Sequence, residues 1–503
     1  MSANLFTAFE PSFTAGGARP CLTPGGGRTI GYGELAGRSA QYAHALREAG
    51  VAPGDRVAVQ VPKSAENVAL YLACLQAGAV YLPLNTAYTD GELAYFFGDA
   101  EPALVVCASE RRDGVAALEA TRNRPIHTLD AAGKAASPRR RTPKAAGSTR
   151  WRARTTISLR SSTRRAPPGA PRGDDHPWQS ALQRRDADRR LEHQRDDVLL
   201  HALPIYPVHG LFVALNTMLI AGAHLLFEPK FDVARVIELL PGATVMMGVP
   251  TFYTRLLGHR DFDRARCAGM RLFVAGSAPL LAETFKAFEA RTGHAILERY
   301  GMTETGMLCS NPLQGERRPG TVGAPLAGVE LRVADEDGKV LPRGETGVIE
   351  VRGPNVFRGY WRMPEKTEEE FHEGGFFITG DVGFVDDDGY LHIIGRAKDM
   401  IISGGFNVYP KEIEEVIDRM DGVEESAVIG LPHPDFGEGV AAVVVAETQA
   451  AVSEEAVIET VRAELASFKA PKAVFLVDTL PRNSMGKVQK NALRQRFVDR
   501  FLR

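Results

Sequence analysis

The stretch GYLHIIGRAKDMIISGGFNVYPKEIEEVI, residues 389–417, decides how this chain is organised. An apolar strand leads into a Gly-Arg pair, Lys398 follows, and a second short strand ends at Gly404 and Gly405. Pro410 then opens a helix with an acidic first turn, as the helix dipole favours. Adjacent glycines leave the backbone unrestrained, so we predict a join between two domains, residues 1–397 and 398–503. Taken alone, the same residues are also compatible with two strands joined by a turn that carries a surface salt bridge.

The sequences on the two sides of this join predict different patterns of helices and strands. After residue 398, a helix and two strands are followed by a second helix and a last strand, which predicts a small α+β domain. From Gly344 to Arg396 the text is rich in strands, and the letters DDDG at 386–389 are a hairpin signal.

The N-terminal part reads as α/β. Helical and strand patterns alternate from Gly31 to Val106 and resume after Val198, as in βαβ units on a parallel sheet. A single core stops growing at roughly 250 to 300 residues, so a chain of 503 residues must contain more than one.

The composition is that of an ordinary globular enzyme, with 44% hydrophobic and 24% charged residues. We find no apolar run of roughly 18 residues and no basic-then-apolar leader, so we expect no membrane partner and a cytoplasmic location. The spacing of the cysteines fits neither a zinc site nor a disulfide framework, which indicates reduced thiols. They are Cys21, Cys74, Cys107, Cys267 and Cys309.

The segment 134–195 breaks the pattern. It holds 15 Arg and 2 Lys against 5 acidic residues, a net charge of +12, which leaves −14 for the rest of a chain whose total is −2. It has few aliphatic residues at either period and cannot build a core. Blocks of like charge are usually solvated, so a basic insertion that binds nucleic acid is one interpretation. The acidic remainder counts against it, and we expect no nucleic-acid partner.

Two motifs place polar groups at strand ends. VAGSAPL, residues 274–280, ends a strand in small residues that let a flat or anionic ligand approach the backbone. LERYGMTET, residues 297–305, combines an aromatic face, hydroxyls and a carboxylate suited to a divalent cation. Each motif alone is a weak signal.

Two later motifs add a carboxylate and a cation. TGD, residues 379–381, carries a carboxylate suited to two ribose hydroxyls, and PRNSMGKVQK offers Lys487 after a glycine. Such a lysine is more often a solvated surface residue. The order ERYGMTE, TGD, GRAKDMIISGG and PRNSMGK, however, resembles the adenylate-forming superfamily of acyl-CoA synthetases, luciferases and peptide-synthetase adenylation domains. The resemblance covers residues 5–133 and 196–503.

This resemblance implies a fold and a reaction. The fold is a large N-terminal domain of stacked α/β subdomains plus a small β-barrel, followed by a mobile α+β lid. A carboxylate attacks the α-phosphate of ATP to give an acyl-adenylate and pyrophosphate, and the thiol of coenzyme A then displaces AMP. The implied cofactors are ATP, Mg²⁺ and coenzyme A.

The resemblance also implies site residues. Adenine and the α-phosphate would be held by Gly276, Ser277, Ala278, Glu298, Arg299, Tyr300, Gly301, Met302 and Thr303. Glu304 would bind magnesium, Asp381 would bind the ribose with Arg396 beside it, and Lys487 would bridge the carboxylate and the α-phosphate. The lid would rotate about Lys398. This rotation would remove Lys487 from the site and bring another loop of the lid to the pantetheine arm of coenzyme A. That loop is Ser403, Gly404, Gly405 and Phe406.

Within the superfamily the sequence is most similar to the malonyl-CoA synthetases. A short diacid brings a second carboxylate, and a buried anion needs a cation and hydrogen-bond donors, for which arginine is best suited. Arg255, in VPTFYTRLL, is our first choice. The remaining pocket residues are His209, Ser277, Arg299 and Met302. Taken alone, Arg255 is a helix-surface arginine and His209 a satisfied core histidine.

One departure from the superfamily is decisive. Its members carry a loop of the form YTSGTTGRSKG around the β- and γ-phosphates, since successive backbone amides can point at one anion. Here STRRAPPGAPRG, residues 162–173, stands instead. If residues 159–173 are back-translated and read from the third base of each codon, starting within Ser158, the result is AAILYTSGTTGRSKG. We infer that residues 134–195 are a frame-shifted reading, with normal text resuming near Asp196; Pro207, where the superfamily usually has histidine, is a lesser oddity.

We therefore predict an AMP-forming ligase that joins malonate to coenzyme A, acting as a monomer or a dimer. Ligation of methylmalonate, acetate or a coumarate-like acid is the alternative, and a pocket arginine disfavours the last two. A second alternative is a catalytically impaired relative, because the written sequence lacks the phosphate-binding loop.

Overall fold

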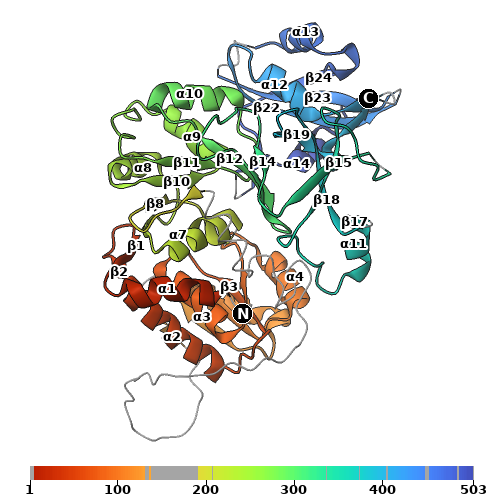
Figure 1. Ribbon diagram of the computed structural model, residues 1–503. Helices are drawn as coiled ribbons and strands as arrows, with labels where there is room; N and C mark the ends of the chain where they lie inside the picture. Colours follow the sequence, from red (N-terminus) through yellow and green to blue (C-terminus); the bar gives the residue numbers. More distant parts are fainter. Residues whose placement is uncertain are drawn as a thin grey trace, which may run out of the picture.

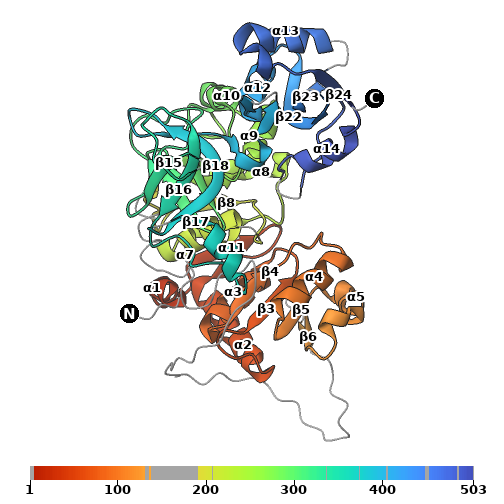
Figure 2. The same cartoon turned by 90° about the vertical axis from the view of Figure 1, so that its right-hand side faces the viewer.

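The computed structural model describes the chain on both sides of the anomalous segment. The described residues are 5–130, 135–136, 191–206, 208–335, 337–372, 374–403, 406–434, 436–447, 452–483 and 486–501. Most of the segment 134–195, together with Pro207, Gly404 and Gly405, lies outside them. Figures 1 and 2 show two stacked α/β subdomains, a β-rich subdomain and a C-terminal domain.

The first subdomain has a five-stranded sheet of order β4-β3-β5-β6-β7. The strands are β3 (Arg56–Gln60), β4 (Val80–Pro83), β5 (Leu104–Cys107), β6 (Ile126–Leu129) and β7 (Ala135–Ala136). The helices are α2 (Tyr32–Glu48), α3 (Ala65–Ala77), α4 (Asp90–Ala100) and α5 (Arg112–Ala117). The first four strands pair in parallel, which confirms the predicted βαβ units.

The second subdomain has a nine-stranded sheet of order β14-β13-β12-β11-β10-β8-β9-β1-β2. Its strands are β1 (Pro20–Pro24), β2 (Ile30–Gly31), β8 (Val198–His201), β9 (His224–Phe227), β10 (Val245–Gly248), β11 (Leu272–Ala275), β12 (Leu297–Met302), β13 (Gly306–Ser310) and β14 (Ala324–Pro325). Its helices are α1 (Phe6–Gly16), α7 (Asn216–Ala221), α8 (Val233–Leu239), α9 (Pro250–Leu257) and α10 (Ala282–Thr292), and a π-helix, η4 (His209–Leu215), precedes α7. The strand β1 comes from the start of the chain and pairs in parallel with β9, Leu22 opposite Leu225.

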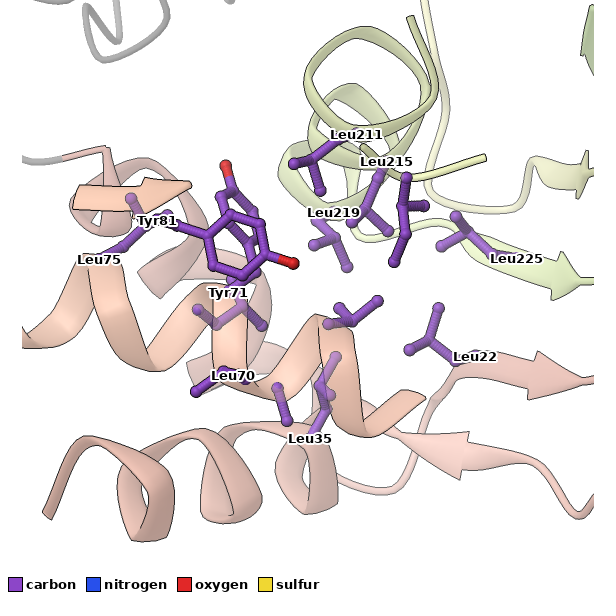
Figure 3. Close-up of a cluster of buried hydrophobic side chains, with 14 of the residues drawn as sticks. Leu22, Leu35, Leu70, Tyr71, Leu75, Tyr81, Leu211, Leu215, Leu219 and Leu225 are labelled. Carbon is purple, nitrogen blue, oxygen red and sulfur yellow. The ribbon is translucent and has the colours of Figure 1, made fainter. Parts of the chain in front are cut away.

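The two sheets share one core. Alternate side chains of the buried strands face opposite layers, so Leu272 and Val274 of β11 join the shared core while Phe273 and Ala275 pack under α8, α9 and α10. Figure 3 shows this core, with leucines of α2, α3, η4, α7, β1 and β9 around Tyr71.

A buried lysine joins the two subdomains. Lys63, which follows β3, donates from Nζ to the Nδ1 of His201, to the His201 carbonyl and to the Leu203 carbonyl, each at 2.8 Å. Three acceptors thus surround this buried amine, and burial lowers the pKa of Lys63 well below its usual value. The other ring nitrogen of His201 lies 2.9 Å from the carbonyl of Gly210 in η4.

The β-rich subdomain is a five-stranded antiparallel sheet, in which β19 pairs with β18. Its strands are β15 (Glu330–Ala334), β16 (Gly347–Arg352), β17 (Phe371–His372), β18 (Phe376–Val385) and β19 (Leu391–Arg396), with helix α11 (Pro364–Glu369). The predicted hairpin is present, since the amide of Gly389 donates to the carbonyl of Asp386 between β18 and β19.

The C-terminal domain has a second mixed sheet covered on both faces. Its strands are β20 (Ile401–Ser403), β21 (Phe406–Val408), β22 (Val423–His433), β23 (Gly437–Ala446) and β24 (Ala473–Val477). Helices α12 (Pro410–Ile417) and α13 (Glu454–Glu464) cover one face, and α14 (Lys490–Phe497) covers the other. This is the α+β composition that the sequence predicted.

The described residues bear on membrane-spanning helices and on the cysteines. No helix among them is both long enough and apolar enough to cross a bilayer. All five cysteines are buried and carry no disulfide.

Candidate active site

The candidate site lies where the parallel strands β10, β11 and β12 end at their carboxyl ends, the usual ligand edge of an open α/β sheet. The loop after β11 begins with Gly276, and a Cβ there would lie 3.4 Å from the Arg299 carbonyl and 3.6 Å from the His209 ring. Ser277 follows with a φ of 71°, in the left-handed region that non-glycine residues rarely adopt. Ala278 is half-buried next to it. Unusual backbone of this kind is concentrated at functional sites.

His209 and Ser277 meet at this loop, and the charge of Arg299 acts on His209. The Nδ1 of His209 lies 3.2 Å from the Oγ of Ser277. Burial, and secondly the charge of Arg299, lower the pKa of His209 to about 4, so its imidazole is neutral at pH 7. Arg299 itself is 3% exposed. A neutral imidazole, a hydroxyl and a buried guanidinium form a donor-rich group suited to a small anion.

Tyr300, Asp381 and Arg396 form a second group on the other side of β12. The Tyr300 hydroxyl donates to Oδ2 of Asp381, and the Nε of Arg396 lies 2.7 Å from Oδ1. Asp381 is buried on β18 opposite Arg396 on β19, so the pairing follows from the strand register. Burial, and secondly the nearby Asp381, raise the pKa of Tyr300 well above its usual value. The predicted neighbours Asp381 and Arg396 are therefore in contact.

The loop after β12 holds the proposed magnesium ligand. Glu304 is half-buried, and its Oε1 accepts from the Tyr360 hydroxyl at 3.3 Å. Thr303 is exposed and Met302 is half-buried beside it. Gly301 sits in a β-bulge where a Cβ would lie 2.0 Å from the carbonyl oxygen of Gly306, so no side chain fits.

No group of three or more metal-binding side chains occurs among the described residues. A single carboxylate, with phosphate oxygens and water, is nevertheless the usual ligand set of Mg²⁺ in nucleotide enzymes, and Glu304 fits that role.

Glu298, also on β12, binds the loop that follows β11. Its Oε1 accepts from the amide of Leu280 at 3.1 Å, and the side chain is 4% exposed. Burial raises the pKa of Glu298 to about 7, against the lowering effects of that amide and of Lys411 on α12.

Arg255 lies on α9 and is exposed, without a hydrogen bond or ion pair to any other residue within the described parts of the chain. The structure therefore does not bring Arg255 into contact with His209 or Ser277.

The loop bearing Lys487 reaches across from the C-terminal domain. Asn483 accepts from the Lys487 amide at 3.0 Å and donates its own amide to the Lys487 carbonyl at 2.9 Å. A Cβ on Gly486 would lie 3.3 Å from the Oγ1 of Thr251, the second residue of α9. Arg482 braces the loop by pairing with Glu425 and donating to the Gly486 carbonyl. The lysine loop thus rests against the N-terminal domain at the ligand edge of the sheet.

The remaining predicted residues lie at the join. Lys398 is in a short 3₁₀ turn, Ala397–Asp399, and the neighbouring Asp399 pairs with Arg494 of α14 at 3.0 Å. Ser403 is buried on β20 opposite Phe406 of β21. Gly404 and Gly405, predicted for the pantetheine loop, lie outside the described residues.

Sequence reasoning missed Thr251, Tyr360 and Lys411. Each meets the site through a contact between distant segments, which no local pattern encodes. The Pro-Lys-Glu start of α12 was visible, but nothing in the sequence indicated that Lys411 would donate to the carbonyl of Ile393 on β19.

The chain matches the AMP-binding enzyme family over residues 9–361 and the C-terminal domain of AMP-binding enzymes over residues 412–487. It is 34% identical to a feruloyl-CoA synthase of Amycolatopsis over 498 residues, covering 94% of this chain and 95% of the relative. It is 33% identical to a malonate–CoA ligase of Arabidopsis thaliana over 481 residues, covering 88% and 78% respectively.

Among solved structures, ATP-bound MatB from Rhodopseudomonas palustris is 48% identical, with 100% of both chains covered and a TM-score of 0.91. Apo MatB from the same organism is 49% identical over the same extent, but its TM-score is 0.78. The chain belongs to the AMP-binding enzyme family, and the curated relatives it matches over most of their length are CoA ligases.

Proposed function

We propose that this protein joins malonate to coenzyme A through a malonyl-adenylate, with AMP and pyrophosphate as products. The observation that carries the proposal is the convergence of Ser277 and His209, Tyr300 and Asp381, and the Lys487 loop at one sheet edge. The 48% identity to MatB over the whole chain, and the malonate–CoA ligase among the relatives, favour malonate within the CoA ligases.

In the first half-reaction the adenosine binds between the loop after β11 and β12. Asp381, oriented by Tyr300 and Arg396, accepts from the ribose hydroxyls. Gly276 and Gly301 allow close packing within the protein, because a Cβ at either position would meet a backbone carbonyl, and adenine and the α-phosphate bind beside them. Lys487 bridges the attacking carboxylate and the α-phosphate, where a fixed cation stabilises charge on the transferring group.

Glu304 would hold Mg²⁺, which neutralises charge on the phosphates when it is bound. The Tyr360 hydroxyl already donates to the Glu304 carboxylate and holds it toward the loop.

The second carboxylate of malonate is bound by His209, Ser277 and Arg299. With the Ser277 hydroxyl donating to Nδ1, the neutral imidazole presents an Nε2–H to the acid, and Arg299 supplies the buried positive charge. Arg255 on α9 would also bind this carboxylate, by turning its exposed side chain toward the substrate.

In the second half-reaction the C-terminal domain swivels about Lys398. The Lys487 loop leaves Thr251, and the strand pair that carries Ser403 and Phe406 faces the pantetheine arm.

The written sequence tests the role of the phosphate loop. Protein made from it should release little pyrophosphate, because residues 159–173 lack the hydroxyls, glycines and lysine that surround the β- and γ-phosphates. A chain with the frame restored over 134–195 should convert malonate, ATP and coenzyme A to malonyl-CoA. The measurement is pyrophosphate release with mass detection of the thioester.

The panel of acids should contain malonate, methylmalonate, acetate and ferulate. Malonate is expected to give the highest kcat/KM, and ferulate should be inactive. Preference for ferulate would place the chain with the aryl-acid ligases, since the feruloyl-CoA synthase of Amycolatopsis is about as similar to it as the malonate–CoA ligase of Arabidopsis thaliana. Rapid turnover by the written chain would contradict our view of the loop.

A further inference from the structure

The Lys487 loop, whose described residues are 481–483 and 486–489, has the hydrogen bonds of a small hairpin. The amide of Asn483 donates to the Lys487 carbonyl at 2.9 Å, and the Oδ1 of Asn483 accepts from the Lys487 amide at 3.0 Å. The Asn483 carbonyl accepts from the amide of Gly486 at 2.9 Å. A short two-stranded hairpin is marginally stable by itself, so the position of Lys487 depends on what holds the loop.

Arg482 holds this loop in two directions. It lies opposite Val488 in an antiparallel bridge, at the base of the hairpin. Its Nη1 donates to the carbonyl of Gly486 at 2.6 Å, directly before Lys487, and its Nη2 pairs with the Oε2 of Glu425 on β22. A planar guanidinium can make both contacts at once. Arg482 therefore ties the backbone that precedes Lys487 to the sheet of the C-terminal domain.

The ion pair of Arg482 and Glu425 is partly shielded from water. The two side chains are 29% and 27% exposed. Burial raises the pKa of Glu425, and the charge of Arg482 opposes that rise. Downstream of the hairpin, Lys490 at the start of α14 pairs with Glu414 of α12 at 2.6 Å, so the loop is anchored at both ends.

We propose that Arg482 and Glu425 are positioning residues for adenylation, because they form the Lys487 loop within the C-terminal domain before it meets the N-terminal domain. The proposal rests on the proposed role of Lys487. Both residues belong to the C-terminal domain, so the loop keeps their support when the domain rotates.

The loop meets the N-terminal domain at Gly486, where a Cβ would lie 3.3 Å from the Oγ1 of Thr251 on α9. A catalytic group that is already in position needs no reorganisation when it docks. A displacement of about 1 Å, in contrast, can slow a reaction about 10²-fold. The contacts of Arg482 therefore bear on the rate of adenylation, although Arg482 itself need not touch a substrate.

Order in the loop can be measured without turnover, by amide hydrogen exchange and mass spectrometry. The peptide to follow carries the amides of Asn483, Gly486 and Lys487, which all donate within the hairpin. In the full-length chain with the frame restored over 134–195, Arg482→Gln should speed their exchange about fivefold, the upper end for a partly exposed ion pair. Glu425→Gln should act in the same direction, and the double variant should match Arg482→Gln.

Lys469 supplies the matched control. It pairs with Glu412 at 2.7 Å in the same domain, and the two side chains are 20% and 32% exposed. Lys469→Gln should leave exchange in the Lys487 loop as in the wild type, and thermal unfolding of each variant verifies folding. Unchanged exchange in Arg482→Gln, or an equal increase in Lys469→Gln, would overturn the proposal.

The two half-reactions then show whether this order serves adenylation. Arg482→Gln should lower kcat for pyrophosphate release about tenfold, with the KM values for ATP and malonate within about twofold and thioester formation from supplied malonyl-adenylate unchanged. Equal rates in both half-reactions for the folded variant and the wild type would overturn the positioning role. Failure of Lys487→Ala to slow pyrophosphate release would contradict the proposed role of that lysine, whereas the exchange result would still decide whether Arg482 orders the loop.

Discussion

Replacing Glu298 by glutamine should stabilise the folded chain at pH 8 and have a much smaller effect at pH 5. Glutamine keeps the shape and the hydrogen bond from the Leu280 amide, but it removes a carboxylate that is 4% exposed. Burial raises the pKa of Glu298 from 4.5 to about 7. Because the folded-state pKa is the higher one, the associated stability is fully present below pH 4.5 and is lost as the pH rises through 7.

The magnitude follows from the shift of about 2.5 pH units. At 1.36 kcal/mol per unit, the wild type loses about 3 kcal/mol by pH 8 and about 1 kcal/mol by pH 5 relative to the variant. The free energy of unfolding, from urea titrations followed by circular dichroism at the two pH values, measures both. Glu289→Gln, at an exposed position on α10 in the same subdomain, is the control. Equal effects of Glu298→Gln at both pH values, or a loss of stability at pH 8, would refute this reasoning.

Four further substitutions test other parts of the structure. In the frame-restored chain, Lys487→Ala should lower pyrophosphate release at least about 10²-fold and spare thioester formation from supplied malonyl-adenylate, because the lysine acts only on the α-phosphate. Arg255→Ala should raise the KM for malonate about tenfold or more with the KM for ATP unchanged; equal KM values for malonate would remove the arginine from the pocket. Gly301→Ala should cost about 3 kcal/mol of unfolding free energy, since its Cβ would lie 2.0 Å from a carbonyl oxygen; an unchanged melting temperature would contradict this. Lys63→Met should cost about 3 kcal/mol by leaving the buried Nδ1 of His201 and the Leu203 carbonyl without this donor, and a neutral result would show that the two subdomains do not depend on this joint.

Much of the fold could be predicted because it is local. The helix and strand rhythm of residues 31–106 and 198–275 reappears as the βαβ units, and the letters at 386–389 form the predicted hairpin. The pairing of β1 with β9 could not be predicted, because nothing near Leu22 specifies a partner two hundred residues away. Register between distant strands depends on the shared core, not on propensity.

In the candidate site, too, some contacts could be predicted from the sequence and others could not. The contact of Asp381 with Arg396 follows from adjacent antiparallel strands, and motif order was enough to anticipate it. The contact of Lys411 with the Ile393 carbonyl depends on the orientation of α12 against β19, which sequence patterns do not contain. Arg255 was chosen for its chemistry, and its exposed position on α9 leaves its role to experiment.

Because β1 pairs with β9, it is synthesised long before its partner strand. Leu22 leaves the ribosome long before Leu225, and at about 5–20 residues per second a separation of about 200 residues corresponds to roughly 10–40 seconds. During that interval Cys21 and Leu22, both fully buried at the end, have no β9 to pair with. This end of the nine-stranded sheet is therefore completed late, and a nascent chain that stops before residue 227 has only β2 beside β1, which leaves the other edge of this apolar strand open to aggregation.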